Sequence, residues 1–129
     1  MNTNDVTKLS LRRAPGSPVL SVGHRGARGH APENTLASFN LAVEMGVQAV
    51  ETDVHFTADG EIVCIHDHTV DRTTNGHGFV KDLTLAQIKA LSASYGRAEF
   101  AAERVPTLAE LCEIVPADVA LALELKTDR

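Results

Sequence analysis

VETDVHFTADGEIVCIHD, residues 50–67, is the stretch that most constrains the fold of this chain. Its first half alternates mostly apolar side chains with polar ones, as a strand with two unlike faces does. One face carries Val50, Thr52, Val54 and Phe56. The other face carries Glu51, Asp53 and His55.

A hairpin is expected next, because Asp59-Gly60 is a dipeptide typical of tight turns between strands. Residues 61–65 form a second strand-like run that ends at His66-Asp67. The return of the chain places His66 close to the carboxylate end of the first strand. Two acids and one imidazole then make a candidate hydrolytic site.

Length and composition predict one soluble globular domain, with 129 residues, 43% of them hydrophobic and 22% charged. A net charge of -5 argues against a nucleic-acid or anionic-membrane binder, although a few Arg and Lys can still form a local anion site. Cys64 and Cys112 have no metal or disulfide spacing, so we expect small buried hydrophobes in a reducing compartment.

The N-terminal residues show no secretory signal, since residues 1–18 contain no apolar core segment. No apolar run reaches the ~18 residues of a membrane span. We therefore expect a cytoplasmic protein without a transmembrane segment.

The rest of the chain predicts alternating strands and helices. Residues 1–18 are expected to be a loose tail, and helices are expected from Asn34 or Thr35 to Met45, over 84–91 and over 107–115. Strands are expected at 19–22, 49–56 and 119–125, and residues 67–105 are too long for an ordinary connection, which predicts an insertion with its own small structure.

This order is a βαβ pattern and predicts a parallel sheet, in which ligands gather at the carboxyl ends of the strands. Three pairs of residues belong to that rim. They are His24-Arg25 after the first strand, Glu51 and Asp53 late in the second, and Glu124 and Lys126 at the end of the third.

Each of these residues also has an ordinary structural interpretation. The acids alone could be solvated or ion-paired, but both faces of a parallel sheet are usually covered, and buried carboxylates need a cation. An all-carboxylate set favours Mg2+ or Ca2+ over zinc. Arg25 and Lys126 either neutralise the acids or bind an anionic substrate. His55 lies at the loop edge and is a weaker ligand candidate, and the loop histidines are interpreted as solvated: His30, His68 and His77.

As a set, the motifs over about residues 20–126 closely resemble the glycerophosphodiester phosphodiesterase family. They are His24-Arg25-Gly26, Pro32-Glu33-Asn34-Thr35, Glu51-Thr52-Asp53-Val54, His66-Asp67, Arg72-Thr73-Thr74, Pro106-Thr107-Leu108 and Glu124-Leu125-Lys126. The resemblance implies a TIM-type (β/α)8 barrel with a small insertion after the second strand. It implies hydrolysis of glycerophosphodiesters to glycerol 3-phosphate and an alcohol.

By the same resemblance, a divalent cation is held by Glu51, Asp53 and Glu124. His24 and His66 form the acid/base pair, and Arg25 and Lys126 contact the phosphate. A barrel of this type needs ~250 residues, so this chain supplies about three of eight strands. We therefore expect the isolated chain to be marginally folded and weakly active or inactive, with an open sheet edge that permits self-association.

Two other functions stay open. One is a related barrel phosphodiesterase that acts on phospholipids, against which the acidic charge and the lack of an apolar docking stretch count. The other is a non-catalytic half-barrel that binds a cation or another chain.

Overall fold

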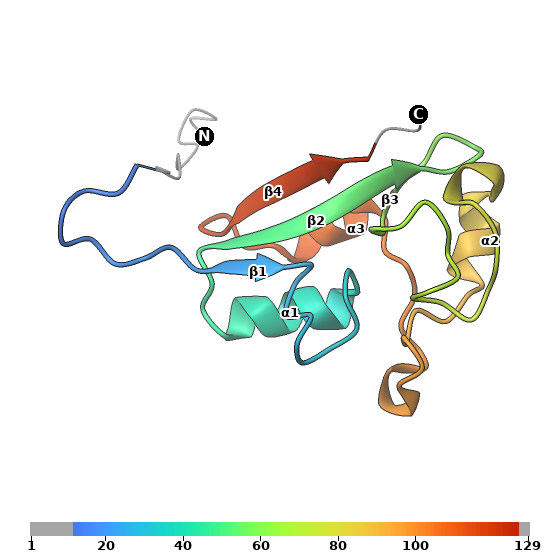
Figure 1. Cartoon of the computed structure of the whole chain (residues 1–129), viewed down its shortest axis with the longest axis horizontal. Coiled ribbons are helices and arrows are strands. Elements are labelled where there is room, and N and C mark those ends of the chain that lie inside the picture. Colours follow the sequence, from blue (N-terminus) through green and yellow to red (C-terminus); the bar gives the residue numbers. More distant parts are fainter. Residues whose placement is uncertain (1–11, 127–129) are drawn as a thin grey trace.

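Strand β2, Ala49–Phe56, is the centre of a four-stranded sheet in the computed structural model, which describes residues 12–126 (Figure 1). The other strands are β1 Val22–His24, β3 Ile62–Cys64 and β4 Ala120–Leu125. The α-helices are α1 Leu36–Glu44, α2 Leu85–Lys89 and α3 Leu108–Ile114. Two short 3-10 helices are η1 Val80–Asp82 and η2 Ala98–Phe100.

The sheet is parallel at its core. Ala49 of β2 pairs with Val22 of β1 and with Ala120 of β4, so these two parallel strands lie on opposite edges of β2. Strand β3 returns antiparallel and pairs Val54 with Cys64, beyond the end of β1. Among the described residues β1 and β4 pair only with β2, so the sheet is open on both sides.

Helices α1 and α3 cover one face of the sheet (Figure 1). Thr35 caps α1 by accepting from the Ser38 N–H, and Thr107 starts α3 with a capping box, so both helices begin where the sequence predicts. Their apolar faces pack on the Val50 and Val54 side of β2. The buried members of this core are Phe39, Ala42, Val50, Val54, Cys64 and Leu111.

The segment that follows β3 packs a second, smaller core against that strand. Residues Val63 and Ile65 point away from α3 and meet apolar side chains of the later segment. Those are Val70, Val80, Ile88, Ala93 and Val105. The segment thus lies over the carboxyl end of β2 (Figure 1). Its assignment as an insertion spanning 67–105 stays a prediction.

Two sequence-based predictions need correction. The first strand lies at Val22–His24, not 19–22, because β2 begins at Ala49 and offers Val19 and Leu20 no strand partner. Cys64 is buried as expected, but Cys112 is exposed, since it follows the buried Leu111 and turns outward on α3.

The N-terminal part of the chain is only partly described. Residues 12–18 contain no helix or strand, and the rest of the predicted loose tail lies outside the described residues. Across residues 12–126 no helix is long and apolar enough to cross a membrane.

Candidate active site

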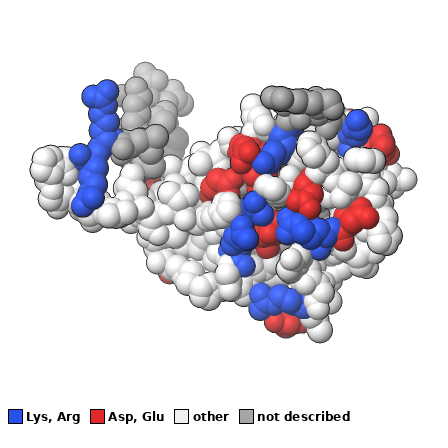
Figure 2. Space-filling view, in the orientation of Figure 1, with Lys and Arg blue, Asp and Glu red and all other residues white. Residues whose placement is uncertain are grey.

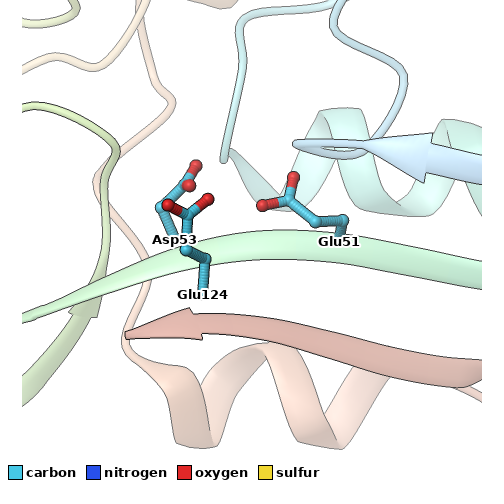
Figure 3. Close-up of side chains that lie close together, drawn as sticks. All are labelled: Glu51, Asp53 and Glu124. Atoms are coloured by element: carbon cyan, nitrogen blue, oxygen red, sulfur yellow. The ribbon is translucent and has the colours of Figure 1, made fainter. Parts of the chain in front are cut away.

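Three carboxylates meet on the face of the sheet that lies away from α1 and α3 (Figure 3). Glu51 and Asp53 project from β2, and Glu124 of β4 pairs directly with Asp53 in the strand register. One oxygen from each carboxylate lies within 4.8 Å of the others. The alternation of β2 and the parallel register of β4 together produce this cluster.

Asp53 is the buried centre of the cluster, with 1% of its surface exposed. Asn34 Nδ2 donates to Asp53 Oδ2 at 3.2 Å, and Arg25 Nε lies 3.4 Å from the same oxygen. Burial alone would raise the pKa of Asp53, but the Asn34 hydrogen bond and nearby positive charges outweigh burial and lower it. Its other oxygen, Oδ1, is buried and has no hydrogen-bond partner.

Glu51 lies at the end of the cluster nearest β1. Its Oε2 accepts the backbone N–H of Arg25 at 3.1 Å and lies 3.8 Å from His24 Nε2. Burial, together with the charge of Asp53, raises the pKa of Glu51. The two neighbouring carboxylates of β2 therefore differ in how strongly they hold a proton.

The loop between β1 and α1 delivers Arg25 and Asn34 to Asp53. Both residues have left-handed backbones, with φ of 52° and 55°. Gly26 follows Arg25 with φ of 79°, and a Cβ there would lie 2.5 Å from Ser38 Oγ and 2.8 Å from the Phe39 N. The loop is therefore pressed against the start of α1, and glycine permits that approach.

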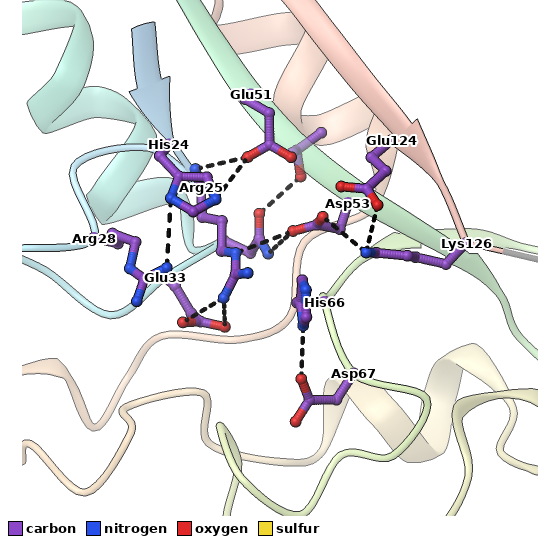
Figure 4. Close-up of polar contacts among 12 residues, drawn as sticks. His24, Arg25, Arg28, Glu33, Glu51, Asp53, His66, Asp67, Glu124 and Lys126 are labelled. Atoms are coloured by element: carbon purple, nitrogen blue, oxygen red, sulfur yellow. Dashed lines mark hydrogen bonds and ion pairs between the residues drawn. The ribbon is translucent and has the colours of Figure 1, made fainter.

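Lys126 lies just beyond β4 and faces two of the carboxylates (Figure 4). Its Nζ is 2.6 Å from Glu124 Oε1 and 3.7 Å from Asp53 Oδ1. The hydrogen bond to Glu124 raises the pKa of Lys126. The ammonium group thus supplies part of the positive charge that this acidic cluster requires.

His66 approaches the cluster from the end of the β2–β3 hairpin (Figure 4). Its Nδ1 lies 2.8 Å from Asp67 Oδ1, and its positive form lowers the pKa of Asp53. His55 is buried within β2, where its Nε2 lies 3.0 Å from the His66 carbonyl oxygen. His55 is the second-last residue of β2, so it lies beside the loop that follows Phe56, as the sequence predicts.

The structure brings the seven sequence-predicted site residues to one rim (Figure 4). They are His24, Arg25, Glu51, Asp53, His66, Glu124 and Lys126. Their catalytic, phosphate-binding and metal-binding roles stay predictions. Of the other histidines, His77 is exposed beside Asp71, and His68 contacts the His55 ring.

Three further residues join this rim although the sequence analysis assigned them no role in the site. Glu33 accepts from Arg25 Nη1 at 3.2 Å and from Arg72 Nη2 at 2.7 Å, and Asn34 fixes Asp53. Glu33 and Asn34 fall in a helix-start motif, and Arg72 falls in a turn-rich run. Their membership in the resemblance motifs was the available signal.

The residues present fit a hard divalent cation. The three candidate ligands are all carboxylates, which Mg2+ and Ca2+ prefer. The buried Asp53 Oδ1 without a hydrogen-bond partner is the kind of atom that such an ion would satisfy.

Comparison with known proteins identifies the family. Residues 24–129 match the Glycerophosphoryl diester phosphodiesterase family. A glycerophosphodiester phosphodiesterase from Caldanaerobacter subterraneus is 50% identical over 111 residues, which are 84% of this chain and 46% of that protein. The chain therefore spans less than half the length of this relative.

Solved structures agree. A glycerophosphodiester phosphodiesterase from Agrobacterium tumefaciens superposes with a TM-score of 0.82 and 39% identity, covering 85% of this chain and 48% of that one. An Oleispira antarctica phosphodiesterase, solved with its product sn-glycerol-3-phosphate, superposes with a TM-score of 0.80 and 43% identity. The match covers 84% of this chain and 44% of that one. The prediction of a partial TIM-type barrel is confirmed. With this sequence match and this fold, the chain belongs to the glycerophosphoryl diester phosphodiesterase family.

Proposed function

We propose that this chain carries the metal-binding and acid/base part of a site that hydrolyses glycerophosphodiesters to glycerol 3-phosphate and an alcohol. The observation that supports this most is the convergence of three carboxylates, with His24 3.8 Å from Glu51, at the carboxyl rim of a parallel sheet. The product bound to the Oleispira relative is the product expected here.

The proposed cation ligands are Glu51, Asp53 and Glu124. A bound Mg2+ or Ca2+ would supply Lewis-acid polarisation of the phosphoryl oxygens and would lower the pKa of an attacking hydroxyl. Asp53 is suited to hold the cation because Asn34 and Arg25 hold its Oδ2, which leaves its Oδ1 for the ion. The loop between β1 and α1, in which Arg25 and Asn34 have left-handed backbones, therefore orients Asp53, the central proposed ligand.

Proton transfer is assigned to the two histidines. One of His24 and His66 takes the proton of the attacking hydroxyl, from the glycerol or from water, as the new P–O bond forms. The other gives a proton to the departing alcohol oxygen as the old P–O bond breaks. Attack by water gives glycerol 3-phosphate directly. Attack by the glycerol hydroxyl gives a cyclic phosphate, and a water molecule then adds to phosphorus and opens the ring by the same pair of proton transfers to give glycerol 3-phosphate. Each such transfer contributes roughly 10^2 to 10^4 in rate.

Arg25 and Lys126 are assigned to the phosphodiester. Both are cations next to the carboxylate cluster, and Arg25 is mostly buried. Charge-assisted hydrogen bonds from such groups hold a phosphate and stabilise charge that grows on its oxygens. In this proposal Lys126 leaves Glu124 and turns to the phosphate when the cation binds.

The remainder of the barrel is expected to supply the other substrate contacts, so weak or absent turnover is proposed for residues 1–129 alone. Self-association through the open edges of β1 and β4 is part of the same proposal. A cytoplasmic location also stays a prediction.

The test measures release of glycerol 3-phosphate from a glycerophosphodiester, with Mg2+, with Ca2+ and with a chelator. It is run on the chain and on a chimera that continues it with the C-terminal residues of the Caldanaerobacter relative. Cation-dependent release by the chimera is expected. A chimera that releases none, while the intact relative does, contradicts the proposal. Preference for intact phosphatidylinositol would instead favour the phospholipid reaction.

A further inference from the structure

Arg72 connects two segments of the rim that are far apart in the sequence. Its guanidinium donates to both oxygens of Asp67, at 2.9 and 3.0 Å, and to Glu33 Oε1 at 2.7 Å. Asp67 belongs to the turn after β3, and Glu33 to the loop before α1. Positive and negative side chains alternate over this face of the molecule (Figure 2).

One path of contacts from Arg72 runs through Asp67 to His66. Asp67 Oδ1 lies 2.8 Å from His66 Nδ1, and a carboxylate oxygen can only accept a hydrogen bond. The hydrogen bonds from Arg72 lower the pKa of Asp67, so the group is ionised at neutral pH. His66 must therefore carry its proton on Nδ1 when the ring is neutral, which leaves the Nε2 lone pair free to accept one.

A second path of contacts from Arg72 runs through Glu33 to Arg25 and the carboxylate cluster. Arg25 Nη1 lies 3.2 Å from each oxygen of Glu33, and Arg25 Nε lies 3.4 Å from Asp53 (Figure 4). Glu33 is therefore held between two guanidinium groups. Burial alone would raise the pKa of Glu33, but hydrogen bonds from Arg72 and Arg25 and the Coulombic attraction of these two cations outweigh burial and lower it.

Backbone strain is concentrated along the same connections. Among residues 12–126, three residues other than glycine have positive φ: Arg25, Asn34 and Tyr95. Arg25 contacts Glu33, and Asn34 holds Asp53. The Tyr95 ring lies 5.8 Å from the Arg72 guanidinium carbon. Strained backbone of this kind persists where the surrounding contacts fix it, often at functional sites.

From these contacts we infer that Arg72 is a positioning residue, which sets the tautomer of His66 through Asp67 and the orientation of Arg25 through Glu33. This inference rests on the proposed function, because it gives Arg72 a part in that reaction. The segment after β3 thus aligns one proton-transfer group and one phosphate-binding group at once. A planar fork is needed to hold both oxygens of Asp67 while a further N–H reaches Glu33, and a lysine ammonium has no such fork.

The test reads the His66 tautomer directly and needs no turnover. The chain is labelled with 15N-histidine, and the ring nitrogen shifts are recorded above the ordinary imidazole pKa, with His66→Gln used to assign the signal. Wild-type chain is expected to show the Nδ1–H form of His66. Arg72→Gln and Arg72→Lys are both expected to reduce the separation between its two nitrogen shifts to less than half.

The matched control is Arg97→Gln. Arg97 lies in the same segment, and its side chain is 39% exposed against 38% for Arg72. It also reaches the loop before α1, by donating to the His30 carbonyl. Its side-chain hydrogen bonds go to Glu99 and to the His30 carbonyl rather than to Asp67 or Glu33, so its loss should leave the His66 shifts unchanged. Equal changes of the His66 nitrogen shifts in Arg72→Gln and Arg97→Gln would indicate a general loosening of the segment and would overturn the inference.

Arg72→Lys serves if Arg72→Gln does not fold, which amide spectra will show. An unchanged Nδ1–H signal in Arg72→Lys overturns the inference, whether or not the chain is an enzyme. If the chain shows the tautomer change but the chimera with the Caldanaerobacter C-terminal residues releases no glycerol 3-phosphate, the proposed function alone is contradicted.

Discussion

Lys126 Nζ lies 3.7 Å from Asp53 Oδ1, the buried carboxylate oxygen that has no hydrogen-bond partner. The same ammonium group is 2.6 Å from Glu124 Oε1. Two of the three proposed cation ligands therefore already face a positive charge. A divalent ion that binds there must compete with Lys126.

The first prediction follows from this competition. Asp53→Asn is expected to weaken Mg2+ or Ca2+ binding by at least about tenfold, because even residues behind metal ligands contribute roughly 10–100-fold. Lys126→Met is expected to tighten binding, since it removes the competing charge. Calorimetric titration measures both, with the exposed Asp118→Asn as control. Weaker binding in Lys126→Met would contradict the competition.

The histidine roles give the second prediction. In the chimera with the Caldanaerobacter C-terminal residues, His24→Ala and His66→Ala should each lower turnover by roughly 10^2 to 10^4, with cation affinity nearly unchanged. His77→Ala is the control, because His77 is exposed and its ring pairs with the side chain of Asp71. A variant of His24 or His66 with normal turnover would remove that residue from the mechanism.

Alternation in β2 and capping residues made much of the fold and site predictable from sequence. Glu51 and Asp53 share a face because strand side chains alternate, and Glu124 reaches them because β4 is parallel and in register. The position of β1 was not predictable from apolar character, since Val19 and Leu20 are apolar yet unpaired. Strand pairing depends on the partner strand, which local sequence does not contain.

The third prediction compares two glycines in the loop before α1. Gly26→Ala places a Cβ against the start of α1 at a left-handed position, whereas Gly29→Ala meets no atom within 4 Å. We expect Gly26→Ala to lower the free energy of unfolding by about 2–4 kcal/mol, from backbone strain and overpacking. Gly29→Ala should change it by less than about 0.5 kcal/mol. Urea unfolding measures both, and equal effects would show that the loop does not depend on this approach.

Contacts between distant charged side chains were not predictable in the same way. Arg72 and Glu33 are 39 residues apart and lie in segments whose composition indicates only a turn and a helix start. Their pairing depends on how the segment after β3 folds over the rim. Periodicity and capping describe one element at a time, so they carry no information on such a contact.

The fourth prediction concerns acid stability. Arg72 lowers the pKa of Asp67, so this pair stabilises the fold above the ordinary aspartate pKa and loses that effect as pH falls through the lowered value. The difference in unfolding free energy between wild type and Asp67→Asn should be constant from neutral pH and shrink below about pH 4. Denaturant unfolding across pH measures it. In an Arg72→Gln background, the effect of Asp67→Asn on the unfolding free energy should depend much less on pH. If it depends on pH as strongly as in the presence of Arg72, a group other than Arg72 causes the dependence.

The open edge of β4 gives the fifth prediction. Leu125 is 73% exposed and, with Phe56, Ile62 and Leu108, lines an apolar cavity of about 420 Å³ on the helix-covered side of the sheet. Exposed apolar edges favour association, and a charge on an edge strand opposes it. We therefore expect concentration-dependent self-association that Leu125→Lys reduces, measured by sedimentation velocity.

Val19→Lys is the matched control for that experiment. Val19 is 74% exposed but lies outside the sheet, so the same charge there should leave association unchanged. Equal reductions by both lysines would mean that net charge, rather than the β4 edge, governs association. A wild-type chain that stays monomeric at every concentration would show that the unpaired edge of β4 and its exposed Leu123 and Leu125 are too small a surface to hold two copies together.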